Sequence, residues 1–95
     1  MAVTIYTRQT CGFCFRALNL LDELGANYHQ IPVDFDFAAL KTMREKSNRR
    51  TVPQIWIGEL HVGGCDELFD LHYQGKLVPL LEADRNNNEQ NKVST

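Results

Sequence analysis

A pair of cysteines between a strand pattern and a helix pattern constrains the fold more than any other feature of the chain. Residues 3–6 are mostly β-branched or aromatic, which predicts a short strand. Apolar residues then recur every three or four positions over 12–24, and Gly25 stands where a helix ends. Cys11 and Cys14 are therefore expected at the start of a first helix, directly after a first strand.

The remaining elements follow from the same kinds of pattern. They are a strand over 28–33, a helix over 37–47, strands over 54–57 and 60–62 joined by a tight turn, a helix over 66–74, and a last turn over 78–81. Two parallel strands linked by a helix and followed by a hairpin predict a mixed four-stranded sheet. The order is thioredoxin-like, and the expected fold class is α/β with three or more helices flanking the sheet.

The chain length fits one domain. The sequence has 95 residues, of which 43% are hydrophobic and 23% charged, so it can bury a modest core. We expect the folded domain to span residues 1–83. Residues 84–95 contain several asparagines and no large apolar side chain except Val93, which predicts a mobile C-terminal tail.

Charge and hydropathy exclude two classes of partner. The net charge is −2 and the basic residues form no stripe, which argues against nucleic-acid binding. No apolar run approaches the roughly 20 residues that span a bilayer, and the N-terminus does not resemble a secretory signal. The chain is therefore expected in the cytoplasm, away from membranes.

The position of the two cysteines predicts redox chemistry. A sulfur at a helix N-terminus faces unpaired backbone N–H groups, and the guanidinium of Arg8 lies close in sequence, so a thiolate at Cys11 is favoured. Cys14 is one helical turn further on, within disulfide reach and more shielded. Cys11 is thus the candidate nucleophile and Cys14 the candidate resolving thiol.

A zinc site is the plainest alternative for a Cys-x-x-Cys pair. Such a site needs a second pair of ligands. Cys65 and the three histidines, His29, His61 and His72, show no such pair at zinc spacing. Redox chemistry is the stronger interpretation because the pair follows a predicted strand.

Three segments together resemble the signature segments of glutaredoxins. They are Thr7–Cys14, Thr51-Val52-Pro53 and Gly63-Gly64-Cys65-Asp66, in the order and at the spacing found in that family. The resemblance extends from Val3 to about Leu81 and is strongest to the bacterial-type dithiol members. Three ordered motifs are far more specific than one Cys-x-x-Cys.

The resemblance implies a site for glutathione. It implies a cis bond between Val52 and Pro53, which would leave the backbone of Val52 free to pair with the cysteinyl part of the tripeptide. Arg8 and Arg50 would meet the glycine carboxylate, and the start of the third helix would meet the γ-glutamyl group. The full implied site is Arg8, Phe13, Arg50, Thr51, Val52, Pro53, Gly64, Cys65 and Asp66. The alternative is that Arg8, Arg49 and Arg50 are ordinary surface charges and that Asp66 only caps a helix.

The expected activity is glutathione-dependent thiol-disulfide exchange. The chain would reduce protein–glutathione mixed disulfides and protein disulfides, with glutathione as reductant and with no metal or organic cofactor. Its partners would be glutathione and glutathionylated or disulfide-containing proteins, and the chain is expected to be a monomer.

Two rival functions stay open. Cys11-Gly12-Phe13 departs from the Cys-Pro-Tyr common among dithiol relatives and matches the start of the single-thiol motif. Relatives with that start can hold a [2Fe-2S] cluster between two chains, which makes Cys11 a candidate cluster ligand. The second rival is a redoxin of the same fold that receives electrons from a flavin reductase. Arg8, Thr51 and Asp66 argue against it.

Overall fold

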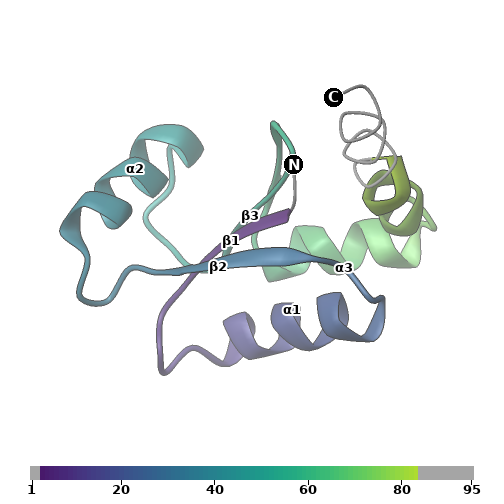
Figure 1. The fold of residues 1–95 in the computed structure, drawn as a ribbon, viewed down its shortest axis with the longest axis horizontal. Helices are drawn as coiled ribbons and strands as arrows, with labels where there is room; N and C mark the ends of the chain where they lie inside the picture. Colours follow the sequence, from purple (N-terminus) through teal and green to yellow (C-terminus); the bar gives the residue numbers. More distant parts are fainter. Residues whose placement is uncertain (1–2, 84–95) are drawn as a thin grey trace, which may run out of the picture.

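The chain folds around a four-stranded mixed sheet covered by helices on both faces (Figure 1). The computed structural model describes residues 3–83. The elements are β1 (Val3–Thr7), α1 (Gly12–Glu23), β2 (Tyr28–Pro32), α2 (Phe37–Ser47), β3 (Gln54–Ile57), β4 (Leu60–Gly63) and α3 (Cys65–Tyr73). A further helical segment covers residues 77–83. The predicted tail over 84–95 and the first two residues of the predicted domain lie outside the described residues.

The strand order in the sheet is β2-β1-β3-β4. β1 pairs with β2 in parallel and with β3 in antiparallel register, and β3 and β4 form an antiparallel hairpin. The parallel pair needs a long crossover, and α1 supplies it. The mixed four-stranded sheet that the sequence predicts is therefore confirmed.

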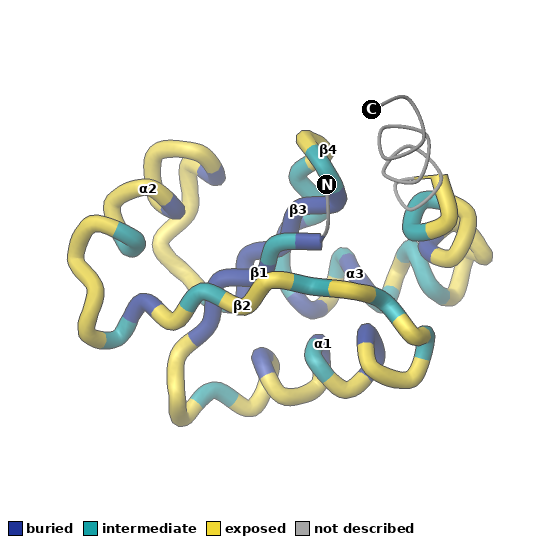
Figure 2. The backbone as a smooth tube through the Cα atoms, viewed as in Figure 1, coloured by how far each residue is buried: buried dark blue, intermediate teal, exposed yellow. Residues whose placement is uncertain are grey.

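Side chains that alternate along β1 supply two separate cores. Val3 and Ile5 pack on the face covered by α1 and α3, whereas Tyr6 packs on the face covered by α2. Figure 2 shows the buried segments gathered along the central strands and on the inner sides of the helices. The first core comprises Val3, Ile5, Ala17, Leu20, Leu21, Ile55, Ile57, Cys65, Leu68 and Leu77, and the second comprises Tyr6, Val33, Met43 and Trp56.

The sheet register brings three loops together at one edge. Tyr6 near the end of β1 pairs with Gln54 at the start of β3, so the segment before β3 lies beside the segment after β1. Ile55 pairs with Gly63 at the end of β4, which places the start of α3 at the same edge. The three predicted signature segments therefore meet although they are far apart in sequence.

Several predicted boundaries differ from the structure by one residue, since α1 ends at Glu23, β2 at Pro32, β4 at Gly63 and α3 at Tyr73. α3 begins at Cys65, one residue earlier than expected, because Gly64 is its extended N-cap residue. The last predicted turn is longer than expected and is helical over 77–83, where Leu77 is fully buried in the first core. Within residues 3–83, no helix is both long enough and apolar enough to cross a membrane.

Candidate active site

Cys11 is the N-cap residue of α1, and it is partly exposed. Its backbone is extended, with φ −120° and ψ 107°, and its Sγ accepts a hydrogen bond from the backbone N–H of Cys14 at 3.1 Å. The same Sγ lies 3.8 Å from the carbonyl oxygen of Val52. Cys11 is partly exposed, whereas Cys14 is buried. The structure thus brings the sulfur of Cys11 to the surface beside the backbone of Val52.

Cys14 differs from Cys11 in its surroundings. Its side chain is only 1% exposed. Burial raises the pKa of the Cys14 thiol to about 12, and the hydrogen bond with Cys11 adds to the effect. The Cys14 thiol is therefore protonated at neutral pH, as expected of a resolving thiol that reacts only after Cys11 has formed a mixed disulfide.

The loop before β3 contains the cis peptide bond that the family resemblance implies. The bond between Val52 and Pro53 is cis. The fully buried Gln54 holds Thr51, three residues earlier, because its Nε2 donates to the carbonyl oxygen of Thr51 at 3.0 Å and to its Oγ1 at 3.3 Å. On its other side, Oε1 of Gln54 lies 2.8 Å from Nε2 of His61, whose ring stacks on Trp56. Gln54 therefore ties the cis-proline loop to the hairpin.

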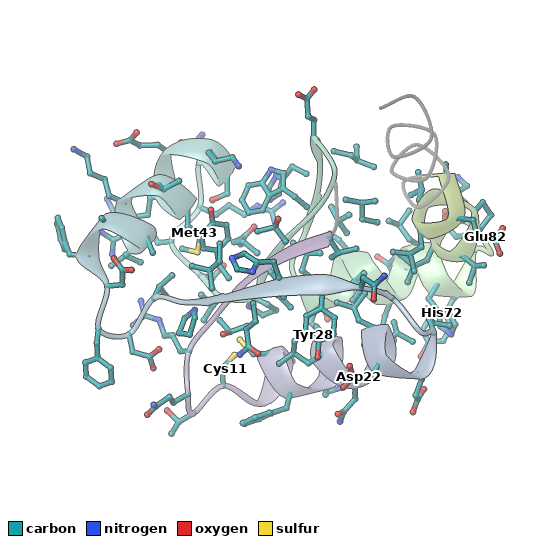
Figure 3. All side chains as sticks on the ribbon, viewed as in Figure 1. Cys11, Asp22, Tyr28, Met43, His72 and Glu82 are labelled. Atoms are coloured by element: carbon teal, nitrogen blue, oxygen red, sulfur yellow. The ribbon has the colours of Figure 1, made fainter. Side chains whose placement is uncertain are left out.

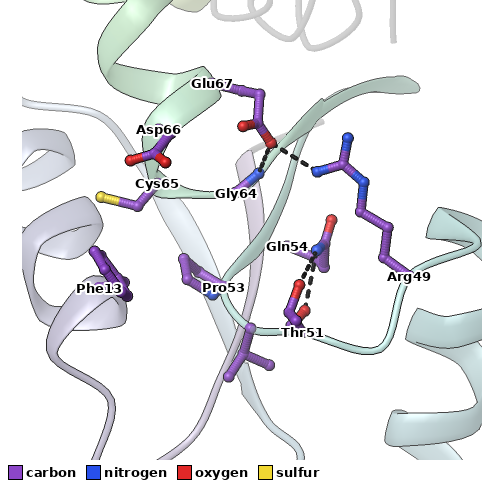
Figure 4. A pocket seen from close by; sticks show the side chains of 10 residues that line it. Phe13, Arg49, Thr51, Pro53, Gln54, Gly64, Cys65, Asp66 and Glu67 are labelled. Atoms are coloured by element: carbon purple, nitrogen blue, oxygen red, sulfur yellow. Dashed lines mark hydrogen bonds and ion pairs between the residues drawn. The ribbon is translucent and has the colours of Figure 1, made fainter.

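A hollow of about 290 Å³ opens between α1, the cis-proline loop and the start of α3. This volume is near the lower end of the range for small-ligand sites, about 300 to 1,000 Å³. Figure 4 shows Phe13 and Pro53 on one side and the N-terminus of α3 above them. The lining residues are Phe13, Arg49, Thr51, Val52, Pro53, Gln54, Gly64, Cys65, Asp66 and Glu67.

Seven of the nine residues predicted for glutathione line this hollow. They are Phe13, Thr51, Val52, Pro53, Gly64, Cys65 and Asp66. Arg8 and Arg50 are exposed and lie outside its lining. Their role toward a carboxylate stays a prediction.

Three lining residues are not among those predicted from the sequence: Arg49, Gln54 and Glu67. Glu67 carried a signal, because a glutamate three residues after an N-cap is the spacing of a capping box. Nothing in the sequence distinguishes Arg49 from Arg50 as a lining residue of the hollow. The buried position of Gln54 follows from the register of β3 with β1, which the sequence does not show.

Glu67 joins the two sides of the hollow. Its Oε1 accepts a hydrogen bond from the backbone N–H of Gly64 at 2.8 Å and from Nη1 of Arg49 at 2.7 Å (Figure 4). These two interactions, the first being the larger, lower the pKa of Glu67 below its ordinary value. Gly63, with φ +114°, allows this arrangement, because a Cβ there would collide with Oε1 of Glu67.

Cys65 is a third thiol close to the hollow. It is buried in the first core, and burial raises its pKa. A buried free cysteine of this kind packs as a small hydrophobic side chain. Among the described residues, no group of three or more His, Cys, Asp or Glu side chains could hold a metal ion.

Figure 3 shows Cys11 at the end of the sheet where β1 leads into α1, away from Glu82 and His72 at the opposite end of the molecule. The cysteine pair, the cis-proline loop and the hollow all lie at this one end of the molecule. The Sγ of Cys11 lies 3.8 Å from the carbonyl oxygen of Val52, which is one of the lining residues of the hollow.

Comparisons with known proteins agree with this geometry. The glutaredoxin family model matches residues 3–62. Glutaredoxin 3 of Escherichia coli K12 is 45% identical over 80 residues, which are 84% of this chain and 96% of that protein. A glutaredoxin of Pseudomonas aeruginosa is 46% identical over 81 residues, covering 85% and 96% of the two chains.

A solved structure is also closely similar. The buckwheat glutaredoxin-glutathione complex superposes with a TM-score of 0.82 at 36% identity, covering 87% of this chain and 78% of that one. The fold is thus thioredoxin-like, as expected. With the paired cysteines, the cis-proline loop and the matching relatives in view, the chain belongs to the glutaredoxin family of thiol-disulfide oxidoreductases.

Proposed function

We propose that the chain uses glutathione to reduce protein–glutathione mixed disulfides and protein disulfides. The observation that carries this proposal is the hollow beside Cys11, bounded by the cis-proline loop and the N-terminus of α3. A similar structure, that of buckwheat glutaredoxin, is a complex with glutathione, which supports the same ligand for this hollow.

The groups around the hollow match the parts of glutathione. The carbonyl of Val52, 3.8 Å from Sγ of Cys11, is a backbone partner for the cysteinyl N–H of a tripeptide bound as an added strand. Asp66, exposed at the first turn of α3, suits the ammonium of the γ-glutamyl group. Arg8 and Arg50, exposed near this end of the sheet, are proposed to attract the glycine carboxylate.

The exchange begins with the thiolate of Cys11. It attacks the glutathione sulfur of a mixed disulfide, so a bond forms between Cys11 and glutathione and the protein thiolate leaves, to be protonated by solvent. The thiolate of a second glutathione then attacks the glutathione sulfur bound to Cys11. This step releases glutathione disulfide and restores the Cys11 thiolate.

Protein disulfides require Cys14 as well. Cys11 attacks one sulfur of the substrate to form a mixed disulfide, and Cys14 then loses its proton and attacks the sulfur of Cys11. The reduced substrate leaves, and two glutathione molecules reduce the Cys11–Cys14 bond while forming glutathione disulfide. The residues supply nucleophile, resolving thiol and substrate site, so no bound cofactor is needed.

A glutathione-coupled assay tests this proposal. Purified protein is supplied with a glutathionylated peptide, glutathione, glutathione reductase and NADPH, and NADPH consumption is followed. In a parallel reaction, thioredoxin reductase replaces the glutathione system. We expect turnover with glutathione only, and turnover with the flavin reductase alone would contradict the proposal.

Size-exclusion chromatography is expected to show a monomer, and fractionation of the native cell is expected to place the protein in the cytoplasm.

Cluster transport is a second candidate function. Cys11 is partly exposed and its Sγ lies 3.8 Å from the carbonyl oxygen of Val52, whereas Cys14 and Cys65 are buried. One chain therefore offers a single accessible thiol, and a [2Fe-2S] unit needs four such ligands. Two chains and two glutathione thiols would supply them. Because that assembly needs a dimer, we propose it as secondary to the oxidoreductase activity.

A further inference from the structure

We propose that Glu67 is a specificity-determining residue that weakens glutathione binding by occupying the positions a substrate carboxylate would take. This inference rests on the proposed function, because it concerns the same hollow. It adds a residue that the signature segments do not contain and assigns it an effect opposite to that of a binding residue.

A single oxygen of Glu67 accepts hydrogen bonds from two donors at this side of the hollow. Oε1 accepts from Nη1 of Arg49 at 2.7 Å and from the N–H of Gly64 at 2.8 Å. Arg49 is the one lysine or arginine among the lining residues, and Gly64 is the N-cap of α3. A guanidinium beside a helix N-terminus is a favourable site for an anion, and here an internal carboxylate fills it.

The charges of the lining residues also bear on the affinity for glutathione. Asp66 and Glu67 contribute two carboxylates against the single guanidinium of Arg49. Glutathione itself carries two carboxylates and one ammonium. Glu67 therefore opposes glutathione in two ways, since it neutralises the local cation and repels the incoming carboxylates.

The position of Glu67 also explains why its effect can be separated from folding. Its hydrogen bond to Gly64 caps α3, and a glutamine can accept the same bond through its own Oε1. Glutamine cannot, however, neutralise Arg49. Glu67→Gln thus retains the cap and removes only the competing charge. The ion pair is solvent-exposed, with side-chain exposures of 48% for Arg49 and 42% for Glu67, so breaking it should cost little free energy.

The experiment compares KM and kcat for the mixed disulfide of glutathione and 2-mercaptoethanol in four variants of the full chain. Glu67→Gln should lower KM about three- to fivefold with kcat unchanged, the size expected for releasing an exposed ion pair. Asp70→Asn is the matched control, because Asp70 is an exposed acid on the same helix outside the hollow. It should change KM by less than about 1.5-fold.

Arg49→Ala and the double variant Arg49→Ala/Glu67→Gln test the mechanism. If Glu67 acts by masking Arg49, most of the gain from Glu67→Gln should vanish when Arg49 is absent. Thermal unfolding midpoints of Glu67→Gln and wild type should agree, which shows that the cap of α3 is intact. Added NaCl should reduce the difference in KM between Glu67→Gln and wild type, because the competition is electrostatic.

Two results would overturn the inference. One is a KM for Glu67→Gln that is unchanged or higher, which would mean that Glu67 positions Arg49 for the substrate instead of competing with it. The other is an equal gain in the presence and absence of Arg49. Wild-type protein that is inactive with glutathione would instead contradict the proposed function, so the two failures are distinguishable.

Discussion

The backbone N–H of Cys14 donates a hydrogen bond to the Sγ of Cys11 at 3.1 Å, so the proposed nucleophile caps the helix that carries its resolving partner. Serine is a favourable N-cap residue and can accept the same bond. Cys11→Ser is therefore a substitution that removes the nucleophile while it preserves the start of α1.

The first prediction separates the roles of the two cysteines. Cys11→Ser should abolish reduction of both glutathionylated peptides and protein disulfides. Cys14→Ser should retain activity on glutathionylated peptides and lose direct reduction of protein disulfides, because only the second reaction needs a resolving thiol. Turnover is measured on each substrate separately, and unfolding midpoints check that both variants are folded. Loss of both activities in Cys14→Ser would show that the assigned roles are wrong.

The second prediction concerns stability at alkaline pH. The pKa of the Cys14 thiol is about 12 in the folded protein, against an ordinary value of 9.0. The folded state therefore holds this proton more tightly than the unfolded state does. Its contribution to stability is complete below about pH 9 and is lost as the pH rises toward 12. The slope approaches about 1.4 kcal/mol per pH unit when the unfolded thiol is fully ionised.

Urea unfolding of the reduced protein between pH 7 and 10.5 measures this effect. Wild type should lose stability faster than Cys14→Ser above about pH 9, because serine does not ionise in this range. Titrating groups that do not interact with Cys14 are common to both proteins and cancel in the difference. Parallel curves for the two proteins would mean that the Cys14 thiol is not perturbed by burial.

The fold and the redox pair could be predicted from local patterns. Residues 12–24 show helical periodicity ended by Gly25, and the helix is found over Gly12–Glu23. Val3 and Ile5 are two residues apart in the predicted strand, so they share one face of it, and both are buried in the same core. Such features can be predicted because the spacing of apolar residues and the position of a terminating glycine follow directly from the backbone geometry of each element.

The far side of the hollow was not predictable in the same way. Arg49 meets Glu67 across 18 residues, and the contact depends on the register of β3 with β4 and on the cis-proline loop. Neighbouring arginines at 49 and 50 look alike in the sequence, yet only Arg49 lines the hollow. Side-chain direction in a loop is fixed by tertiary contacts, which a single sequence does not record.

The third prediction uses two glycines as a matched pair. Gly63 has φ +114°, and a Cβ there would collide with Glu67, whereas a Cβ at Gly12 meets nothing within 4 Å. Gly63→Ala should destabilise the protein by roughly 1–3 kcal/mol, and Gly12→Ala should stay within about 0.5 kcal/mol of wild type. Chemical denaturation measures both. Equal stabilities would show that the contact of Gly63 with Glu67 yields without cost.

The fourth prediction concerns the proposed glutathione contacts. Arg8→Ala and Asp66→Ala should each raise KM for a glutathionylated peptide several-fold, because they remove charges that face opposite ends of the tripeptide. Added salt should weaken wild type in the same direction. Lys76, exposed beyond α3 and outside the hollow, supplies a control in Lys76→Ala, for which KM should not change. Unchanged kinetics in Arg8→Ala and Asp66→Ala together would remove the proposed site.

The last prediction tests the secondary function through Gly12. This residue is the first of α1, follows the N-cap Cys11, and has open space around it. Proline is well suited to that helical position, so Gly12→Pro should fold and keep oxidoreductase activity. It should also stiffen the loop that would otherwise adjust around a large soft ligand at Cys11.

Anaerobic reconstitution with iron, sulfide and glutathione provides the measurement. If the chain carries a cluster, wild type should form a brown dimer that requires glutathione and is absent in Cys11→Ser, because Cys11 supplies the one accessible thiolate of each chain. Gly12→Pro should form less of it at the same protein concentration. A colourless monomer under these conditions would exclude the cluster function. It would leave the thiol-disulfide exchange of Cys11 and Cys14 as the chemistry of this site, because that reaction needs only one chain.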